Sequence, residues 1–150
     1  YSCRAYPLEP AIYGDEKNGY SIASYIVRHD HCRGHGEGKR WTAEKWMQDQ
    51  GMGTYNEHNG AWARVASLLY NQKQLGENNA EHPAVNMAYM ASYNMDTFRR
   101  FVFESSFLER FDVPAERIKK AENDDTALMH LGFDWILRFI GGQGPLAEKK

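Results

Sequence analysis

Apolar side chains recur every three or four positions through most of the chain after Trp41. This spacing places them on one face of an α-helix, because a helix completes a turn in 3.6 residues. Polar segments rich in glycine and asparagine separate the periodic stretches. We therefore predict helices over residues 43–50, 61–75, 83–111, 115–121 and 126–140.

The first predicted helix is bounded by recognisable capping residues. The Thr42 hydroxyl can accept a hydrogen bond from the first turn, and Trp41 and Trp46 stand at the two positions of a hydrophobic staple. Gly51 follows the last turn, where a left-handed residue commonly ends a helix. The composition of residues 54–60 then predicts a turn before the next helix.

The later helices are bounded in similar ways. Pro83 suits a first helical turn, because its missing N–H would have no partner there. Asp96 and Thr97 are both good capping residues, so they predict a break within the long 83–111 segment. Residues 124–126 predict the start of the last helix, and the glycines at 141–142 predict its end.

The N-terminal quarter lacks a sustained period. Residues 1–16 contain prolines and a glycine and predict an extended arm. Residues 18–29 fit an amphipathic helix, which we favour, and also a short β-strand. Residues 29–40 combine alternate glycines with very few apolar side chains, which predicts a loop.

Together these patterns predict a mainly α fold, a single compact bundle of about five or six helices with an irregular N-terminal quarter. A chain of 150 residues with 42% hydrophobic side chains is long enough to bury a core. We expect one helical domain over residues 1–142, with 1–40 as its irregular part and 143–150 as a flexible tail. Strand-like runs do not alternate with the helices, which disfavours a parallel α/β fold.

The charge balance excludes several classes of partner. The chain has 18 Lys and Arg against 20 Asp and Glu, a net charge of −2, with no long block of one sign. Nucleic-acid binders present a basic face, so we expect no nucleic-acid partner. Because the chain has no apolar run of about 18 residues, we expect no membrane insertion. Phosphate-loop and nucleophile-elbow motifs are also absent, so nucleotide cofactors and serine hydrolase chemistry have no support.

The loop at residues 29–37 holds the densest candidate chemistry. His29, His31 and His35 alternate with glycines and an acidic residue, and such imidazoles can converge on one Zn²⁺ or Cu²⁺ ion. This pattern supports, as an alternative function, a small metal-dependent hydrolase with the loop at its centre. The other interpretation is a solvated polar loop that binds no cofactor, because the spacing permits a metal without requiring one.

The two cysteines of the chain, Cys3 and Cys32, both lie in the N-terminal quarter. A disulfide between them would tie the first segment to the domain. Disulfides persist in oxidising compartments, so this bridge would indicate a secreted or periplasmic protein. Two unrelated free thiols would instead indicate a cytoplasmic one.

A second candidate surface lies on the long helical segment. Tyr, Met and Arg are enriched where proteins meet partners, and this segment is apolar on more sides than one stripe requires. We therefore expect a protein that binds another protein or assembles with copies of itself, rather than an enzyme. The residues expected to make these contacts are Tyr89, Tyr93, Met95, Arg99 and Arg100.

Overall fold

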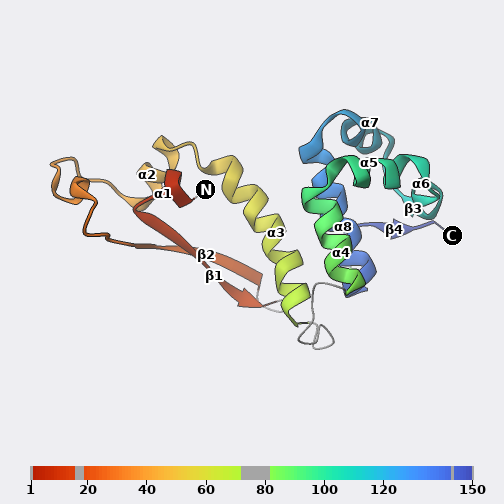
Figure 1. The fold of residues 1–150 in the computed structure, drawn as a ribbon, viewed down its shortest axis with the longest axis horizontal. Helices are drawn as coiled ribbons and strands as arrows, with labels where there is room; N and C mark the ends of the chain where they lie inside the picture. The colour runs from red at the N-terminus through yellow and green to blue at the C-terminus, as the bar shows by residue number, and fades with distance from the viewer. Residues whose placement is uncertain (1, 16–18, 72–81, 143, 150) are drawn as a thin grey trace. The chain divides into compact units, whose positions relative to one another are not determined.

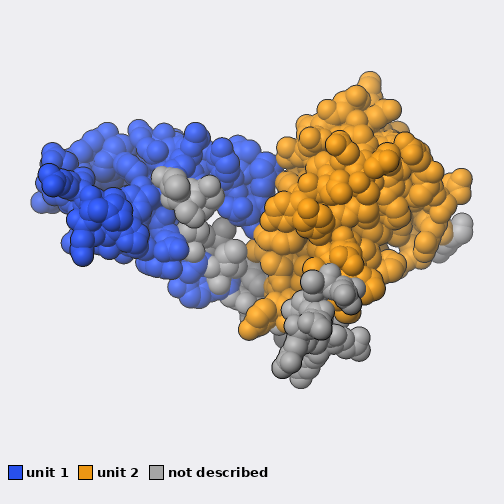
Figure 2. Space-filling model, viewed as in Figure 1, with its two compact units in different colours: residues 1–60 blue, residues 61–150 orange. Residues whose placement is uncertain are grey.

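The computed structural model describes residues 2–15, 19–71, 82–142 and 144–149. The described chain is mainly helical, as predicted, with two small pairs of antiparallel strands (Figure 1). It divides into two compact units, residues 1–60 and 61–150 (Figure 2). Within the described residues, none of the helices is long and apolar enough to span a membrane.

Unit 1 begins with a short helix and a β-hairpin. Helix α1 (Ser2–Ala5) precedes strand β1 (Leu8–Asp15), which pairs antiparallel with β2 (Gly19–Ile26). The pairing runs from Leu8 opposite Ile26 to Asp15 opposite Gly19. One further hydrogen bond extends it, because the Val27 N–H donates to the Pro7 carbonyl at 2.9 Å.

The hairpin corrects two predictions made for the N-terminal quarter. Residues 18–29 contain the strand β2 and not the favoured helix, and the expected irregular arm contains the strand β1. The apolar spacing of so short a segment fits both periods, so it could not decide between them. A helix of this length is marginal alone, whereas β1 lies opposite all eight residues of β2 and forms an antiparallel hydrogen-bonded ladder with it.

The first predicted helix of unit 1 is confirmed as α2 (Ala43–Asp49). The Thr42 hydroxyl accepts a hydrogen bond from Lys45 N–H at 3.2 Å, and Gly51 adopts a left-handed φ of 62° after the last turn. The rings of Trp41 and Trp46 meet edge to face at 5.3 Å between centroids, as the staple requires. A short 3₁₀ turn, η1 (Arg33–Gly36), lies in the preceding loop.

The next helix starts earlier than predicted. Helix α3 (Gly53–Asn71) includes residues 54–60, which were expected to form a turn. Its first turn is supported by Asn56 N–H, which donates to the carbonyl of the fully buried Met52 at 2.9 Å. Extending a helix costs little once one turn has formed. The polar residues 54–60 can therefore continue the helix predicted from residue 61, although they have no apolar stripe of their own. The predicted C-terminal end, residues 72–75, lies outside the described residues.

Unit 2 continues from Ala61 with the rest of α3. Its other elements are α4 (Pro83–Tyr93), α5 (Met95–Glu104), α6 (Phe107–Arg110), β3 (Phe111–Asp112), α7 (Ala115–Asn123), α8 (Asp125–Gly141) and β4 (Ala147–Glu148). Helix α8 contacts α4, α5 and α7, so it forms the centre of the unit (Figure 1).

The core of unit 2 gathers around aromatic rings from α5, α6 and α8. Phe98 contacts Trp135 with ring centroids 5.7 Å apart, and Phe101 lies 5.0 Å from the same indole. Phe107 packs against these three rings. The larger aliphatic side chains that are fully buried with them are Val65, Val102, Leu128, Leu131, Ile136 and Leu146.

The capping predictions for unit 2 are confirmed with one shift of position. The Asp124 carboxylate caps α8 by accepting from Thr126 N–H and Ala127 N–H, and Gly142 ends this helix with a φ of 66°. The break predicted at Asp96 and Thr97 lies at Asn94 instead, whose side chain accepts from Thr97 N–H at 3.3 Å. Asn is as good an N-cap as Asp, so local composition alone did not select between them.

The C-terminal segment differs from the flexible tail that was predicted over residues 143–150. Strand β4 pairs with β3, and Leu146 is buried in the core of the unit. Lys149 N–H also donates to the Arg110 carbonyl at 2.8 Å. One apolar side chain and a two-residue partner strand are enough to hold the segment, although its composition is that of a tail.

Candidate functional site

The histidine-rich loop of unit 1 meets the hydroxyl of Tyr6. His35 Nε2 lies 2.7 Å from this oxygen, and His29 N–H donates to it at 3.4 Å. The Tyr6 ring stacks on His29 with centroids 5.7 Å apart, and His29 stacks on His31 at 5.4 Å. The three predicted histidines therefore lie together, but they are organised around a phenol.

The geometry of these imidazoles does not converge on a metal ion. A histidine donates to a metal through a lone pair in the plane of its ring, and the His29 and His31 rings are stacked within 8° of parallel. Two stacked rings cannot both aim in-plane lone pairs at one ion. The Nε2 atom of His35 is turned to Tyr6. Within the described residues, no group of three or more His, Cys, Asp or Glu side chains is placed to hold a metal.

The thiol of Cys32 belongs to the same cluster. It is free and half-buried, so the predicted bridge to Cys3 is not formed by Cys32 here, and the side chain of Cys3 lies outside the described residues. A hydrogen bond with the Cys32 side chain, together with desolvation, raises the pKa of Tyr6. The phenol therefore keeps its proton at neutral pH and acts as a neutral hydrogen-bonding group.

A cavity of about 570 Å³ opens beside this cluster, within unit 1. The hairpin, the loop and α2 all contribute to its wall. Its lining residues are Tyr6, Pro7, Leu8, Ser24, Ile26, Cys32, Arg33, Gly34, His35, Glu37, Lys39, Trp41, Thr42, Ala43 and Trp46. The sequence predicted the loop and the tryptophans separately and did not indicate that they share one cavity.

Unit 2 has a second hollow, of about 390 Å³, which we call the apolar groove. It is lined from α4, α5, α6, α8 and their connections. Its lining residues are Met87, Met90, Phe101, Ser105, Ser106, Phe107, Arg110, Phe111, Trp135 and Phe139. The groove reaches the surface, because Phe139 is 59% exposed.

Two predicted contact residues lie on the exposed side of α4, and the sequence analysis did not predict the groove next to them. Tyr89 and Tyr93 are exposed and stack with centroids 5.8 Å apart. Tyr93 stands three positions after Met90, so the two are neighbours on the helix surface. Phe139 belongs to the same broad apolar face of α8 as Trp135 and Ile136, and the breadth of that face is the sequence signal that part of it stays exposed.

The other three predicted contact residues have different environments. Met95 is half-buried and packs against the core of unit 2, so it supports the fold more than it presents a surface. Arg100 is exposed, and its guanidinium lies 3.5 Å from the Thr97 hydroxyl. Arg99 is engaged within the unit.

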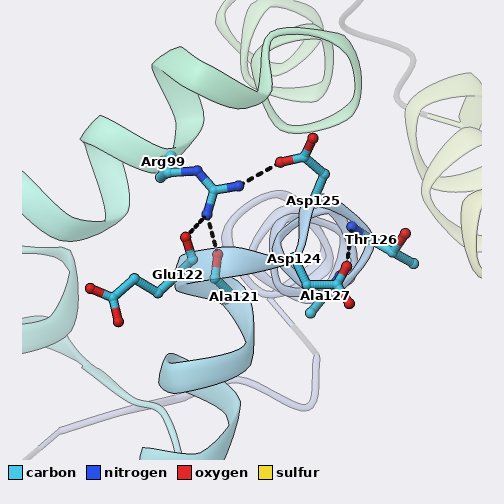
Figure 3. A network of polar contacts seen from close by, with 7 residues as sticks. All are labelled: Arg99, Ala121, Glu122, Asp124, Asp125, Thr126 and Ala127. Carbon is cyan, nitrogen blue, oxygen red and sulfur yellow. Dashed lines mark hydrogen bonds and ion pairs between the residues drawn. The ribbon is translucent and has the colours of Figure 1, made fainter.

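The guanidinium of Arg99 joins α5 to the junction of α7 and α8 (Figure 3). It donates to the carbonyls of Ala121 and Glu122 and to the carboxylate of Asp125. These carbonyls end α7, and the end of a helix leaves carbonyls without intrahelical partners. Arg99 therefore holds the α7–α8 junction, and its predicted role in contacting a partner is not what this geometry favours.

Replacing Arg99 by alanine is expected to lower the free energy of unfolding by about 1–3 kcal/mol, because charge-assisted hydrogen bonds to two carbonyls are lost. The exposed Asp125 adds little to this value. Arg100→Ala is the matched control and is expected to change stability by less than about 0.5 kcal/mol. Urea denaturation of both variants measures the difference, and equal stability of the two would show that the Arg99 contacts contribute nothing.

Comparisons with known proteins found no relative of this chain. No protein-family model matches the chain, and neither a curated protein nor a solved structure matches it.

Proposed function

We propose that this protein is a binding protein and that unit 2 holds a segment of another protein in its apolar groove. The observation that carries the proposal is the groove itself, a hollow of about 390 Å³ lined by methionines and aromatic rings and open to the surface at Phe139. Hollows of this size and lining take a large apolar side chain of a partner.

The lining residues suit recognition by contact. Met87 and Met90 have flexible, polarizable side chains that adapt to the shape of an inserted group. The Trp135 indole forms part of the wall and is held by its contacts with Phe98 and Phe101, so this part of the wall is preformed. A rigid wall lowers the entropy that binding must overcome.

The groove also defines the charge of its partner. Among the described residues that line it, Arg110 carries the charge, and its guanidinium lies 5.9 Å from the Phe111 ring at the edge of the groove. A positive rim beside an apolar hollow favours a segment in which a large apolar residue stands next to an acidic one. Tyr93, 74% exposed, extends the contact surface along α4.

The test selects peptides from a displayed random library against the full chain and measures their affinity by fluorescence polarisation. We expect the selected peptides to share an aromatic or large aliphatic residue beside Asp or Glu. Phe139→Ala is expected to weaken their binding by about tenfold or more, since removing an exposed anchor at an interface centre typically costs at least that much.

Tyr70→Ala is the matched control, because Tyr70 is 90% exposed on α3 and does not line the groove. This variant is expected to bind the peptides as the unmodified chain does. Selected peptides that bind Phe139→Ala with unchanged affinity would refute the groove as their site. Light scattering on the free chain tests whether the groove binds a second copy of the chain. If the chain is a dimer and Phe139→Ala dissociates it, the occupant of the groove is that second copy and not another protein.

A further inference from the structure

The cavity of unit 1 is separate from the apolar groove, and the proposed function does not use it. Its volume of about 570 Å³ lies within the range of small-molecule sites, which is about 300–1,000 Å³. All the residues that line it come from unit 1, so the site depends on one compact unit.

One wall of the cavity is apolar and incompletely covered. Ile26 is 62% exposed although it ends β2 beside the hollow, and Trp41 is also exposed there. Leu8, opposite Ile26 in the hairpin, and Trp46 of α2 complete this wall. A flat hydrocarbon ligand would remove this apolar surface from water at a favourable free energy.

The tryptophan on this wall is held in place. The Trp46 indole N–H donates to the Ala5 carbonyl at 3.0 Å, and its ring contacts Trp41 edge to face. Its orientation is therefore set before any ligand arrives, which favours a planar aromatic ligand over a flexible chain.

The remaining lining is more polar and carries more positive than negative charge. Arg33 and Lys39 line it against a single acid, Glu37. The ion pairs found among the described residues use none of these three side chains. The ammonium of Lys39 lies 3.6 Å from the centroid of the Trp41 ring, so it stands beside the apolar wall instead of pairing with a carboxylate.

The hydrogen-bonded pair formed by Tyr6 and His35 adds further polar groups to this part of the lining. Their side chains are 2.7 Å apart and both line the cavity. Together with the two cations they form a polar surface about an apolar hollow. The acceptor that matches two cations is an anionic oxygen.

We propose that the unit 1 cavity binds a small planar aromatic carboxylate. The aromatic body lies against Ile26, Trp41 and Trp46, and the carboxylate accepts hydrogen bonds from Arg33 and from Lys39, whose ammonium lies at the Trp41 ring. The ligand covers the exposed apolar side chains and gives Arg33 and Lys39 an anionic partner, which the ion pairs of the described residues do not provide.

The probe for this proposal is 2-naphthoate, titrated into the full chain by isothermal calorimetry. The neutral isostere 2-naphthamide and the cation 2-naphthylmethylammonium are titrated in parallel. We expect 2-naphthoate to bind with a submillimolar Kd, and each of the other two to bind at least about tenfold more weakly, because neither provides an anionic acceptor.

Two variants locate the bound probe within the cavity. Ile26→Asp places a negative charge on the apolar wall at an exposed position, so the fold is expected to persist and binding of 2-naphthoate to be lost. Lys39→Gln is expected to weaken binding by about fivefold to tenfold. Lys45→Gln, on α2 but outside the lining, removes an equal charge and is expected to leave the affinity unchanged.

The proposal is overturned if 2-naphthoate fails to bind at about 1 mM, the weak end of ordinary ligand affinities, to a chain whose circular dichroism shows it folded. Equal affinity for the amide and the carboxylate would overturn the assignment of an anionic ligand. Unchanged affinity in Ile26→Asp would place the probe elsewhere. Peptide binding by unit 2 is measured independently, so failure at either site leaves the other result intact.

Discussion

Replacing Phe98 by alanine is expected to lower the free energy of unfolding of unit 2 by about 3–5 kcal/mol. Phe98 is 0% exposed and contacts three other rings, those of Phe101, Phe107 and Trp135. Removing its ring loses both the transfer free energy of the side chain and the dispersion contacts around the cavity left behind. These rings come from α5, α6 and α8, so the gap cannot be closed by moving one helix alone.

Phe139→Ala is the matched control, because it removes the same atoms from a side chain that is mostly in water. It is expected to cost about 1 kcal/mol or less, since little buried area is lost. Chemical denaturation followed by far-ultraviolet circular dichroism measures both variants. Equal losses in the two variants would mean that the aromatic cluster is not the core of the unit.

Replacing Gly132 by alanine is expected to lower the free energy of unfolding, although alanine has the higher helix propensity. Alanine in the middle of a helix is ordinarily favoured over glycine by about 0.5–1 kcal/mol. At position 132 of α8, however, an added Cβ would lie 2.7 Å from the Cβ of Ala91 and 3.2 Å from its backbone oxygen. The Ala91 Cβ is attached directly to the backbone of α4, so it cannot move away without separating the two helices. We expect a net loss of about 1–3 kcal/mol.

Gly60→Ala tests the opposite case in α3. A Cβ added there meets no atom within 4 Å, so the substitution is expected to stabilise the chain by about 0.5–1 kcal/mol. Thermal unfolding of the two variants gives shifts of the midpoint in opposite directions. A stabilised Gly132→Ala variant would contradict the close approach of α4 and α8.

Short-range features of the fold were predictable from residues near one another in the chain. Thr42 was expected to cap a helix, Trp41 to pack on Trp46, and Asp124 to begin the last helix, and the structure confirms all three. Each of these features is satisfied by atoms within one helical turn. The residue types that perform them are few, so the sequence indicates them directly.

Features that require a distant partner were not predictable in the same way. The residues of β2 could not be distinguished from a helix until β1 was found opposite them, and the C-terminal segment is held by Leu146 and by pairing with β3. Arg99 resembled a contact residue because Arg is common at interfaces, yet its guanidinium meets the α7–α8 junction. Hydrogen-bond partners far apart in sequence leave no local pattern.

The candidate sites follow the same division. The sequence alone determined that histidines crowd residues 29–35, that tyrosines and methionines mark the segment from Met87 to Met95, and that the protein is mainly helical. Only the tertiary structure decided that Tyr6 organises the histidines and that Phe139 opens a groove beside Met90. Helical period and capping depend on neighbours in the chain, whereas a cavity is defined by the side chains that meet across it, and their meeting depends on how the elements pack.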